Sequence, residues 1–304
     1  LFIKSAILFF SFYYIYDKLS GAPLILDLPT LFSKNNWLFT IAILILMFVN
    51  WGIEAFKWKL LIAPLEIIDF KSSLKGVLLG VTVSIFTPNR VGEFAGRIFF
   101  LEKADKIQAT IMSLIGSVLQ LLVTVIAGVL AFFLLEKKYY DFFQTEQFIS
   151  TNLLLFIFVL LVVLAMIVFT VLKNQNLSRF KKYIDPFKLH SSKNMNVAFN
   201  LSILRYIVFS IQYYLALKVF GINGGATIVF SLIALAFFVT SVIPTFALTE
   251  IAVRSGVAIY FFGTISTTHA PILAASLFLW IVNLAVPALI GMVFVRKLKF
   301  FKSQ

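Results

Sequence analysis

The sequence predicts an all-α polytopic membrane protein with six spanning helices and two re-entrant (broken) helical hairpins in an inverted-topology repeat. Three observations predict this class: the composition, the lengths of the apolar runs, and a charged motif that occurs twice. Hydrophobic residues make up 61% of the 304 residues and charged residues only 13%, whereas a soluble domain carries about 25% charged residues. We therefore expect one transmembrane domain over residues 1–304.

Six apolar runs come close to or exceed the ~20 helical residues that cross a ~30 Å hydrocarbon core. They cover residues 1–16, 37–56, 107–135, 152–172, 197–220 and 271–295. Two further apolar regions, 76–100 and 226–262, are broken by Pro88 and Pro244. The first is too short to cross twice, which predicts a hairpin that enters and leaves on one side, with protein or a water-filled cavity covering its broken backbone. The second is either a hairpin of the same kind or two short spans.

The distribution of basic residues predicts that both termini are cytoplasmic. With that orientation, the inside loops contain sixteen Lys and Arg residues and the outside loops contain four, as the positive-inside rule requires. The inside segments are 57–75, 102–106, 173–194 and the tail from 296; the outside segments are 17–36, 136–147, 221–225 and 263–270. We expect the net charge of +13 to set topology and meet anionic lipid headgroups rather than nucleic acid. The chain has no cysteine and two histidines, so we expect no metal or other cofactor.

A charged motif occurs once in each half of the chain. The first copy is SIFTPNRVGEFAGR, residues 84–97, and the second is SVIPTFALTEIAVR, residues 241–254. In both copies a Glu follows the Ser by nine residues and an Arg follows the Glu by four. The copies predict an inverted repeat of about 1–135 and 150–296, joined by the outside loop 136–149. In such repeats the substrate site lies near the midplane, between the halves.

The motifs supply the candidate site. Thr87–Pro88 predicts a helix that begins near Asn89, so that its N-terminus and Arg90 form an anion site. Each Glu and Arg four residues apart share a helical face, where they either neutralise each other or serve the site. The candidate substrate-binding residues are Arg90, Arg97, Arg254, Glu93, Glu250, Asn89 and Arg205, the last because an unpaired arginine deep in a span requires an anion or a carboxylate. The structural motif residues are Pro88, Gly92, Gly96 and Pro244, of which the two glycines predict close helix packing.

The first motif region, TPNRVGEFAGRIFFL, resembles the Pro-Gly-Arg-x-Gly-Glu motif of the lysylphosphatidylglycerol synthase transmembrane family, a flippase-like integral membrane domain. The region VIPTFALTEIAVRSGVAIYFFG resembles the second motif of that family, although TFAL replaces its usual Gly-rich stretch and Asn89 replaces a usual Gly in the first. The resemblance covers essentially the whole chain and implies movement of lipids or lipid-linked molecules between leaflets. Full-length synthases of the family also carry a soluble aminoacyltransferase domain, which this sequence lacks, so we expect transport rather than lipid aminoacylation.

We therefore expect a bacterial inner-membrane flippase, not an enzyme, that moves an anionic phospholipid or a lipid-linked phosphate through a mid-membrane site formed by the two hairpins. Two alternatives stay open. One is a membrane transferase that modifies a lipid headgroup, with carboxylates as acid and base. The other is a lipid-binding partner subunit of a glycosyltransferase or synthase. The expected protein partners are a second copy of the chain or an enzyme of lipid synthesis.

Overall fold

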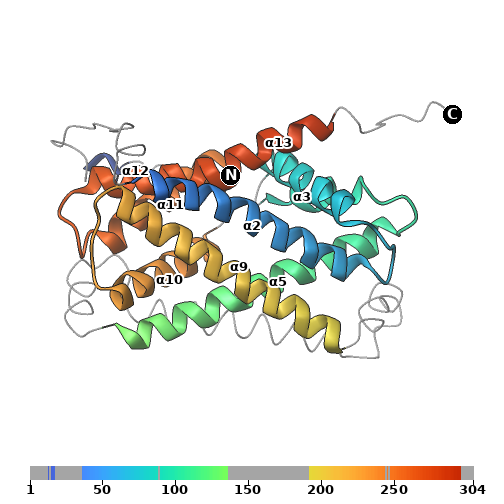
Figure 1. Ribbon diagram of the computed structural model, residues 1–304, viewed down its shortest axis with the longest axis horizontal. Coiled ribbons are helices and arrows are strands. Elements are labelled where there is room, and N and C mark those ends of the chain that lie inside the picture. The colour runs from blue at the N-terminus through green and yellow to red at the C-terminus, as the bar shows by residue number, and fades with distance from the viewer. Residues whose placement is uncertain are drawn as a thin grey trace.

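The computed structural model describes residues 13, 15–17, 36–87, 90–135, 192–243, 245 and 247–295. Every regular element in these residues is helical (Figure 1), which confirms the all-α class. The fourth predicted span, nearly all of the first, and the predicted loop 136–149 lie outside the described residues.

Three helices in the described part of the chain are long and apolar enough to cross a membrane. They are α2 (Trp37–Ile62), α5 (Lys106–Leu134) and a helix at 269–294. The last consists of α12 (His269–Trp280), a π-helical turn η3 (Ile281–Ala285) and α13 (Val286–Val295). The π-helical turn ends two residues before Pro287, which lacks an N–H and would crowd the carbonyl four residues earlier. A fourth long helix, α9 (Ser192–Val219), covers the run predicted at 197–220.

The helix α2 is longer than the predicted run at 37–56, and this changes the position of one lysine. Lys57 was predicted to lie in an inside loop, but it lies within α2 and its side chain is 1% exposed. The run of apolar residues ends at Phe56, whereas the helix continues to Ile62 because Trp58, Leu61 and Ile62 are buried in the core. Lys57 is therefore an interior charge, not a topology signal.

Two pairs of shorter helices lie between the long ones. The first pair is α3 (Phe70–Ile85) and α4 (Gly92–Ile98), and the second is α10 (Ala226–Val242) and α11 (Ala247–Phe262). In both pairs the two helices pack against each other. Figure 1 places α3 toward the right-hand end of the long axis and α10 and α11 toward the left-hand end.

The start of α4 differs from the prediction. The helix begins at Gly92 rather than near Asn89. Thr87 still supplies a cap, since its Oγ1 accepts a hydrogen bond from the Gly92 N–H (2.8 Å). The predicted close packing is present: a Cβ on Gly96 would lie 2.5 Å from the Cα of Gly80 on α3. Pro88, Asn89 and Pro244 lie outside the described residues.

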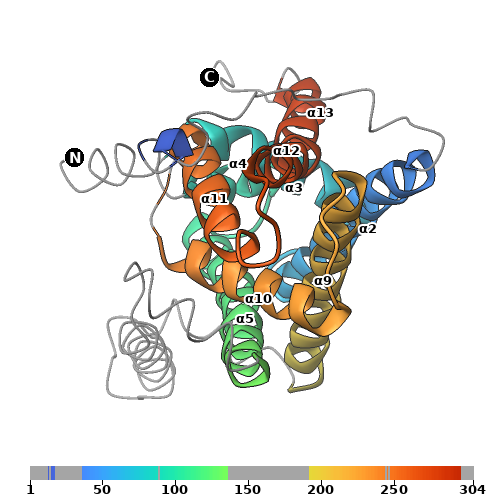
Figure 2. The same cartoon turned by 90° about the vertical axis from the view of Figure 1, so that its left-hand side faces the viewer.

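The contacts between helices follow matching patterns in the two halves. The helix α3 packs against α13, and α10 packs against α5. Both contacts are close at a glycine, because a Cβ on Gly291 would lie 2.2 Å from Leu78 O and one on Gly128 would lie 2.6 Å from Phe238 Cβ. The long helices α2 and α9 lie side by side, as the end-on view in Figure 2 also shows.

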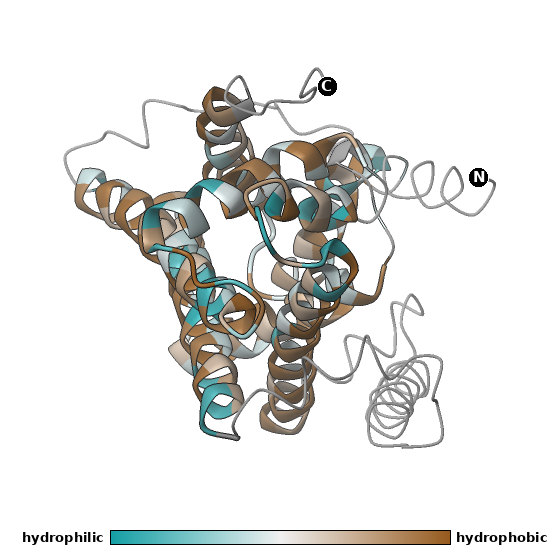
Figure 3. Cartoon of the chain, turned by 90° about the vertical axis from the view of Figure 1, so that its right-hand side faces the viewer, coloured by the Kyte–Doolittle hydropathy of each residue, from teal (hydrophilic) through white to brown (hydrophobic). Residues whose placement is uncertain are grey.

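Hydrogen bonds connect the loop after α2 with the loop after α4. Glu66, after α2, accepts hydrogen bonds from the backbone N–H groups of Glu102 (3.2 Å), Lys103 (2.8 Å) and Ala104 (2.9 Å), after α4. Partial burial raises the pKa of the Glu66 carboxyl, but these donors outweigh it and hold the pKa below the usual 4.5. Figure 3 views the right-hand end of Figure 1 and shows hydrophobic residues along most of the helices, with hydrophilic ones at helix ends.

Candidate functional site

The first charged group, which we name the Glu54 cluster, consists of Glu54, Lys57, Glu93, Arg97 and Arg205. Glu54 lies on α2, and its side chain is 4% exposed. It forms ion pairs with Lys57 Nζ (2.8 Å), Arg97 Nη2 (2.9 Å) and Arg205 Nη1 (2.9 Å). Arg97 also pairs with Glu93, one turn earlier on α4. The three cationic partners fully compensate the negative charge of the buried Glu54 carboxylate. With three cations and two carboxylates, the cluster as a whole carries a net positive charge.

Arg205 links this cluster to the interior cavity described below. Its Nε donates to Asn50 Oδ1 (2.9 Å) while its Nη1 pairs with Glu54. The guanidinium carbon also lies 5.3 Å from the ring centroid of Trp51 and 5.5 Å from that of Phe209, within cation–π range. Asn50 and Glu54, which share a face of α2, thus hold Arg205 in one orientation.

The second group, the Glu250 cluster, consists of Glu250, Arg254 and Arg90. Glu250 Oε1 accepts a hydrogen bond from Arg254 Nε, one turn later on α11 (2.8 Å). Glu250 Oε2 lies 3.8 Å from Arg90 Nε and accepts no hydrogen bond. The carboxylate is 6% exposed, whereas Arg254 is 39% and Arg90 is 32% exposed. Glu250 is therefore held less completely than Glu54.

Arg90 reaches Glu250 from the connection between α3 and α4. Its backbone has a φ of 57°, and among the described residues it alone combines a positive φ with a side chain. The left-handed conformation is uncommon for residues other than Gly, Asn and Asp. The local turn, with the Thr87 cap on one side and the start of α4 on the other, fixes this position of the backbone.

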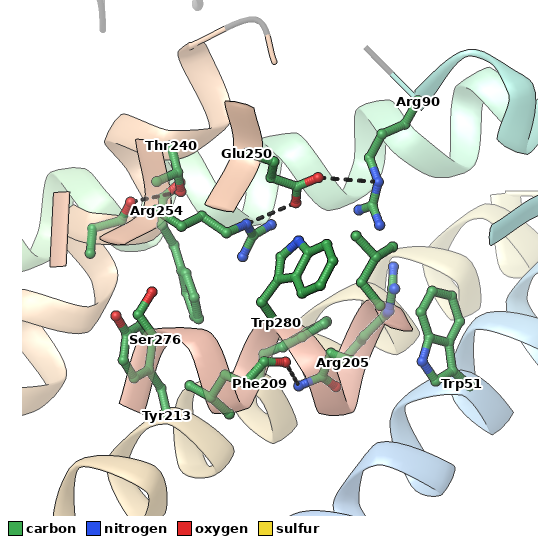
Figure 4. Close-up of a pocket in the computed structure, with 15 residues that line it drawn as sticks. Trp51, Arg90, Arg205, Phe209, Tyr213, Thr240, Glu250, Arg254, Ser276 and Trp280 are labelled. Carbon is green, nitrogen blue, oxygen red and sulfur yellow. Dashed lines mark hydrogen bonds and ion pairs between the residues drawn. The ribbon is translucent and has the colours of Figure 1, made fainter. Parts of the chain in front are cut away.

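A cavity with about 690 Å³ of empty space, in part open to the surroundings, joins the two clusters. Arg90, Arg205, Arg254 and Glu250 supply its charges. Its walls are otherwise mostly aromatic and small polar side chains: Trp51, Phe209, Tyr213, Phe237, Trp280, Thr240, Ser276 and Asn283. Figure 4 shows the indole of Trp280 below Glu250, between Arg254 and Arg90.

A second, more open cavity of about 780 Å³ lies on α10, α11 and the segment between them. It shares Arg90, Thr240, Glu250 and Arg254 with the first. The Glu250 cluster therefore lies where the two cavities meet.

The structure brings four of the seven predicted binding residues together on one cavity: Arg90, Arg205, Glu250 and Arg254. Arg97 and Glu93 do not line either cavity, and Arg97 is 2% exposed. Asn89 lies outside the described residues. The N-terminus of α4 lies at Gly92, whose N–H donates to Thr87 Oγ1, and the side chain of Arg90 lines the cavity.

The prediction missed the aromatic walls and Lys57. Aromatic residues make up 16% of this chain, so Trp51 and Trp280 do not stand out by type. The one signal in the sequence for Trp280 is Pro287, a proline inside the same apolar run. The π-helical turn Ile281–Ala285 lies between the two residues, and such turns often occur at functional sites.

The site can bind an anion. Three guanidinium groups from three different segments converge on one cavity, and arginine forms paired hydrogen bonds with phosphate and carboxylate oxygens. The aromatic walls can cover the less polar parts of a ligand.

No curated protein and no solved structure matches the chain significantly. The family described as "Lysylphosphatidylglycerol synthase TM region" matches residues 1–291, which is nearly the whole chain, and the charged motifs at 84–97 and 241–254 lie within that match. This membrane protein therefore belongs to the lysylphosphatidylglycerol synthase transmembrane family.

Proposed function

We propose that the protein is a flippase of a bacterial inner membrane that moves an anionic lipid or a lipid-linked molecule between leaflets. The observation that carries the proposal is the cavity in which Arg90, Arg205 and Arg254 converge with one carboxylate, Glu250. Charged side chains inside a membrane domain are costly and usually mark substrate or ion pathways. The family match supports a lipid as the substrate class.

The arrangement of helices supports an inverted repeat with two re-entrant hairpins. In Figure 1, α2 and the helix at 269–294 run from left to right, whereas α5 and α9 run from right to left. The α3–α4 pair follows α2 at one end of the long axis and the α10–α11 pair follows α9 at the other. The matched contacts of α3 with α13 and of α10 with α5 fit the same two-fold relation. With six spans, this arrangement and the basic loops favour cytoplasmic termini.

The headgroup competes with Glu250 for its two arginines. Arg254 is held by one short hydrogen bond and Arg90 by a longer ion pair, and both are partly exposed to the cavities. A phosphate that enters either cavity meets these two guanidinium groups first. Arg205 is more buried, and its hydrogen bonds with Glu54 and Asn50 orient it toward the cavity. Acyl chains remain in the lipid. Rocking of one half against the other would then expose the site to each leaflet in turn.

Translocation of acyl-labelled phosphatidylglycerol and phosphatidate in proteoliposomes tests the proposal. We expect Arg254→Gln and Arg90→Gln to lower the rate at least about tenfold, because each removes a charge-assisted contact with the headgroup. Lys71→Gln, which removes an exposed charge on α3, is the matched control and should transport normally. Unchanged rates in both arginine variants would contradict the mechanism.

The same preparation separates the two alternative functions. If purified protein converts a labelled lipid into a modified product, the protein is a transferase. If it translocates nothing alone but co-purifies with a glycosyltransferase or synthase, it is a lipid-binding subunit.

A further inference from the structure

The interior charges of the two clusters do not balance. Among the described residues, the clusters contain five cations and three carboxylates, which leaves a net charge of +2. The Glu54 cluster has three cations and two carboxylates, and the Glu250 cluster has two cations and one carboxylate. Each cluster thus contributes one uncompensated positive charge. A cavity that is lined by a surplus of one sign of charge attracts a ligand of the opposite sign.

The uncompensated charge faces the cavity. The most buried cations, Lys57 and Arg97, do not line it, and both pair with carboxylates that do not line it either. Among the residues that the structure describes, the cations on the cavity wall are Arg90, Arg205 and Arg254, and the acidic residue on that wall is Glu250. The positive charge that the carboxylates of the protein do not neutralise is therefore located on the cavity wall, where a bound headgroup can neutralise it.

The indole N–H of Trp280 also favours an anionic ligand in this cavity. Trp280 Nε1 is buried without a hydrogen-bond partner, although the indole lies directly beside the Glu250 cluster (Figure 4). A buried indole N–H usually finds an acceptor. A phosphate with several free oxygens can accept from this donor as well as from the guanidinium groups.

We infer that the headgroup carries two negative charges, as in a phosphomonoester or pyrophosphate ester of a lipid, rather than the single charge of a phosphodiester. This inference rests on the proposed function, since it names the substrate class of the same cavity. Two negative charges neutralise the surplus of +2, and a terminal phosphate offers three non-ester oxygens to three arginines where a phosphodiester offers two. Bidentate arginine contacts depend on that number of oxygens.

Competitive binding of chain-matched lipids to the purified protein tests the inference. Phosphatidate, phosphatidylglycerol and phosphatidylcholine are compared by native mass spectrometry at about pH 8, where a phosphomonoester with a second pKa of about 6 is doubly charged. We expect phosphatidate to bind about tenfold more tightly than phosphatidylglycerol, because it gains a further set of charge-assisted hydrogen bonds. Inorganic phosphate and pyrophosphate are added as soluble competitors.

Two variants make the charge argument specific. Arg90→Gln lowers the net charge of the clusters to +1, so the preference for phosphatidate should fall to about twofold or less while the protein stays folded, because Arg90 is on a partly exposed turn. Lys71→Gln removes a charge at an exposed site on α3 and should keep the full preference.

The outcomes separate the inference from the proposed function. If phosphatidylglycerol binds as tightly as phosphatidate and both are translocated, the dianion inference is overturned and the flippase remains. If inorganic phosphate or pyrophosphate displaces phosphatidate at equal concentration, the ligand is soluble and the lipid assignment is wrong. If no anionic lipid is preferred over phosphatidylcholine and none is translocated, both proposals fail.

Discussion

Glu93–Arg97 on α4 and Glu250–Arg254 on α11 share one spacing and one place in the repeated motif, but their surroundings differ. Arg97 is 2% exposed and pairs with Glu54 of a neighbouring helix. Arg254 is 39% exposed and lines both cavities. One copy of the motif thus holds helices together, and the other faces the space where a ligand can bind.

The packing beside each motif explains the difference. In the first half Gly80 and Gly96 let α4 approach α3 until a Cβ on Gly96 would lie 2.5 Å from the Cα of Gly80. The residues 157 positions later are Phe237 and Val253. Both of these residues carry side chains where the first half has glycine, and each contributes to a cavity wall. The motif with two glycines beside it is therefore the buried one, and the motif with larger residues at the matching positions faces the cavities.

The largest effect on this comparison is expected from Glu54→Gln. The substitution leaves three cations without their common carboxylate, and breaking a buried ion pair in this way costs about 3–5 kcal/mol. Thermal unfolding in detergent measures the loss. Glu250→Gln is the matched variant and should cost about 1 kcal/mol or less, because its partners are partly exposed. Equal losses in the two variants would remove the distinction between the clusters.

A smaller effect is expected from Gly96→Ala. The added methyl group must push α4 away from α3, and overpacking of this kind costs about 1–3 kcal/mol. Gly52→Ala on α2 is the control, because a Cβ there meets nothing within 4 Å, and it should stabilise the protein by up to about 1 kcal/mol. If Gly96→Ala proves as stable as Gly52→Ala in the same unfolding assay, close packing does not explain the burial of Arg97.

The smallest effect concerns the Glu66 carboxylate, which binds three backbone N–H groups outside the charged interior. Its pKa lies below the usual 4.5, so its contribution to stability is present above that value and is lost as the pH falls through the lower folded-state pKa. Glu66→Gln should therefore lower the unfolding temperature slightly at neutral pH. The difference in unfolding temperature between the variant and wild type should decrease as the pH falls and vanish in strong acid. A difference from wild type that stays constant down to the lowest pH would show that the charge of Glu66 is not involved.

Much of the architecture could be predicted from the sequence, because long apolar runs have few alternatives in a membrane. The helices at 37–62, 106–134 and 269–294 follow directly from such runs. The end of α2 could not be predicted in the same way. The charge of Lys57 suggests a loop residue. Inside the protein, however, its ammonium group donates hydrogen bonds to Gly116 O and Ser202 Oγ and pairs with Glu54.

The candidate site was predicted in part for a related reason. Charged residues in apolar surroundings identified Arg90, Arg205, Glu250 and Arg254, which meet on one cavity. The different placement of Arg97 depends on Glu54, 43 positions away, and nothing in the local motif contains that information. The cavity walls depend on the same long-range packing.

The left-handed backbone of Arg90 has an evolutionary consequence. A side chain in this conformation costs about 1–2 kcal/mol relative to glycine, so selection for stability alone would favour Arg90→Gly. An arginine persists at such a position only while its charge is useful to the organism. A homologue in which this charge is no longer used is therefore expected to carry glycine at this position and to gain stability from the change.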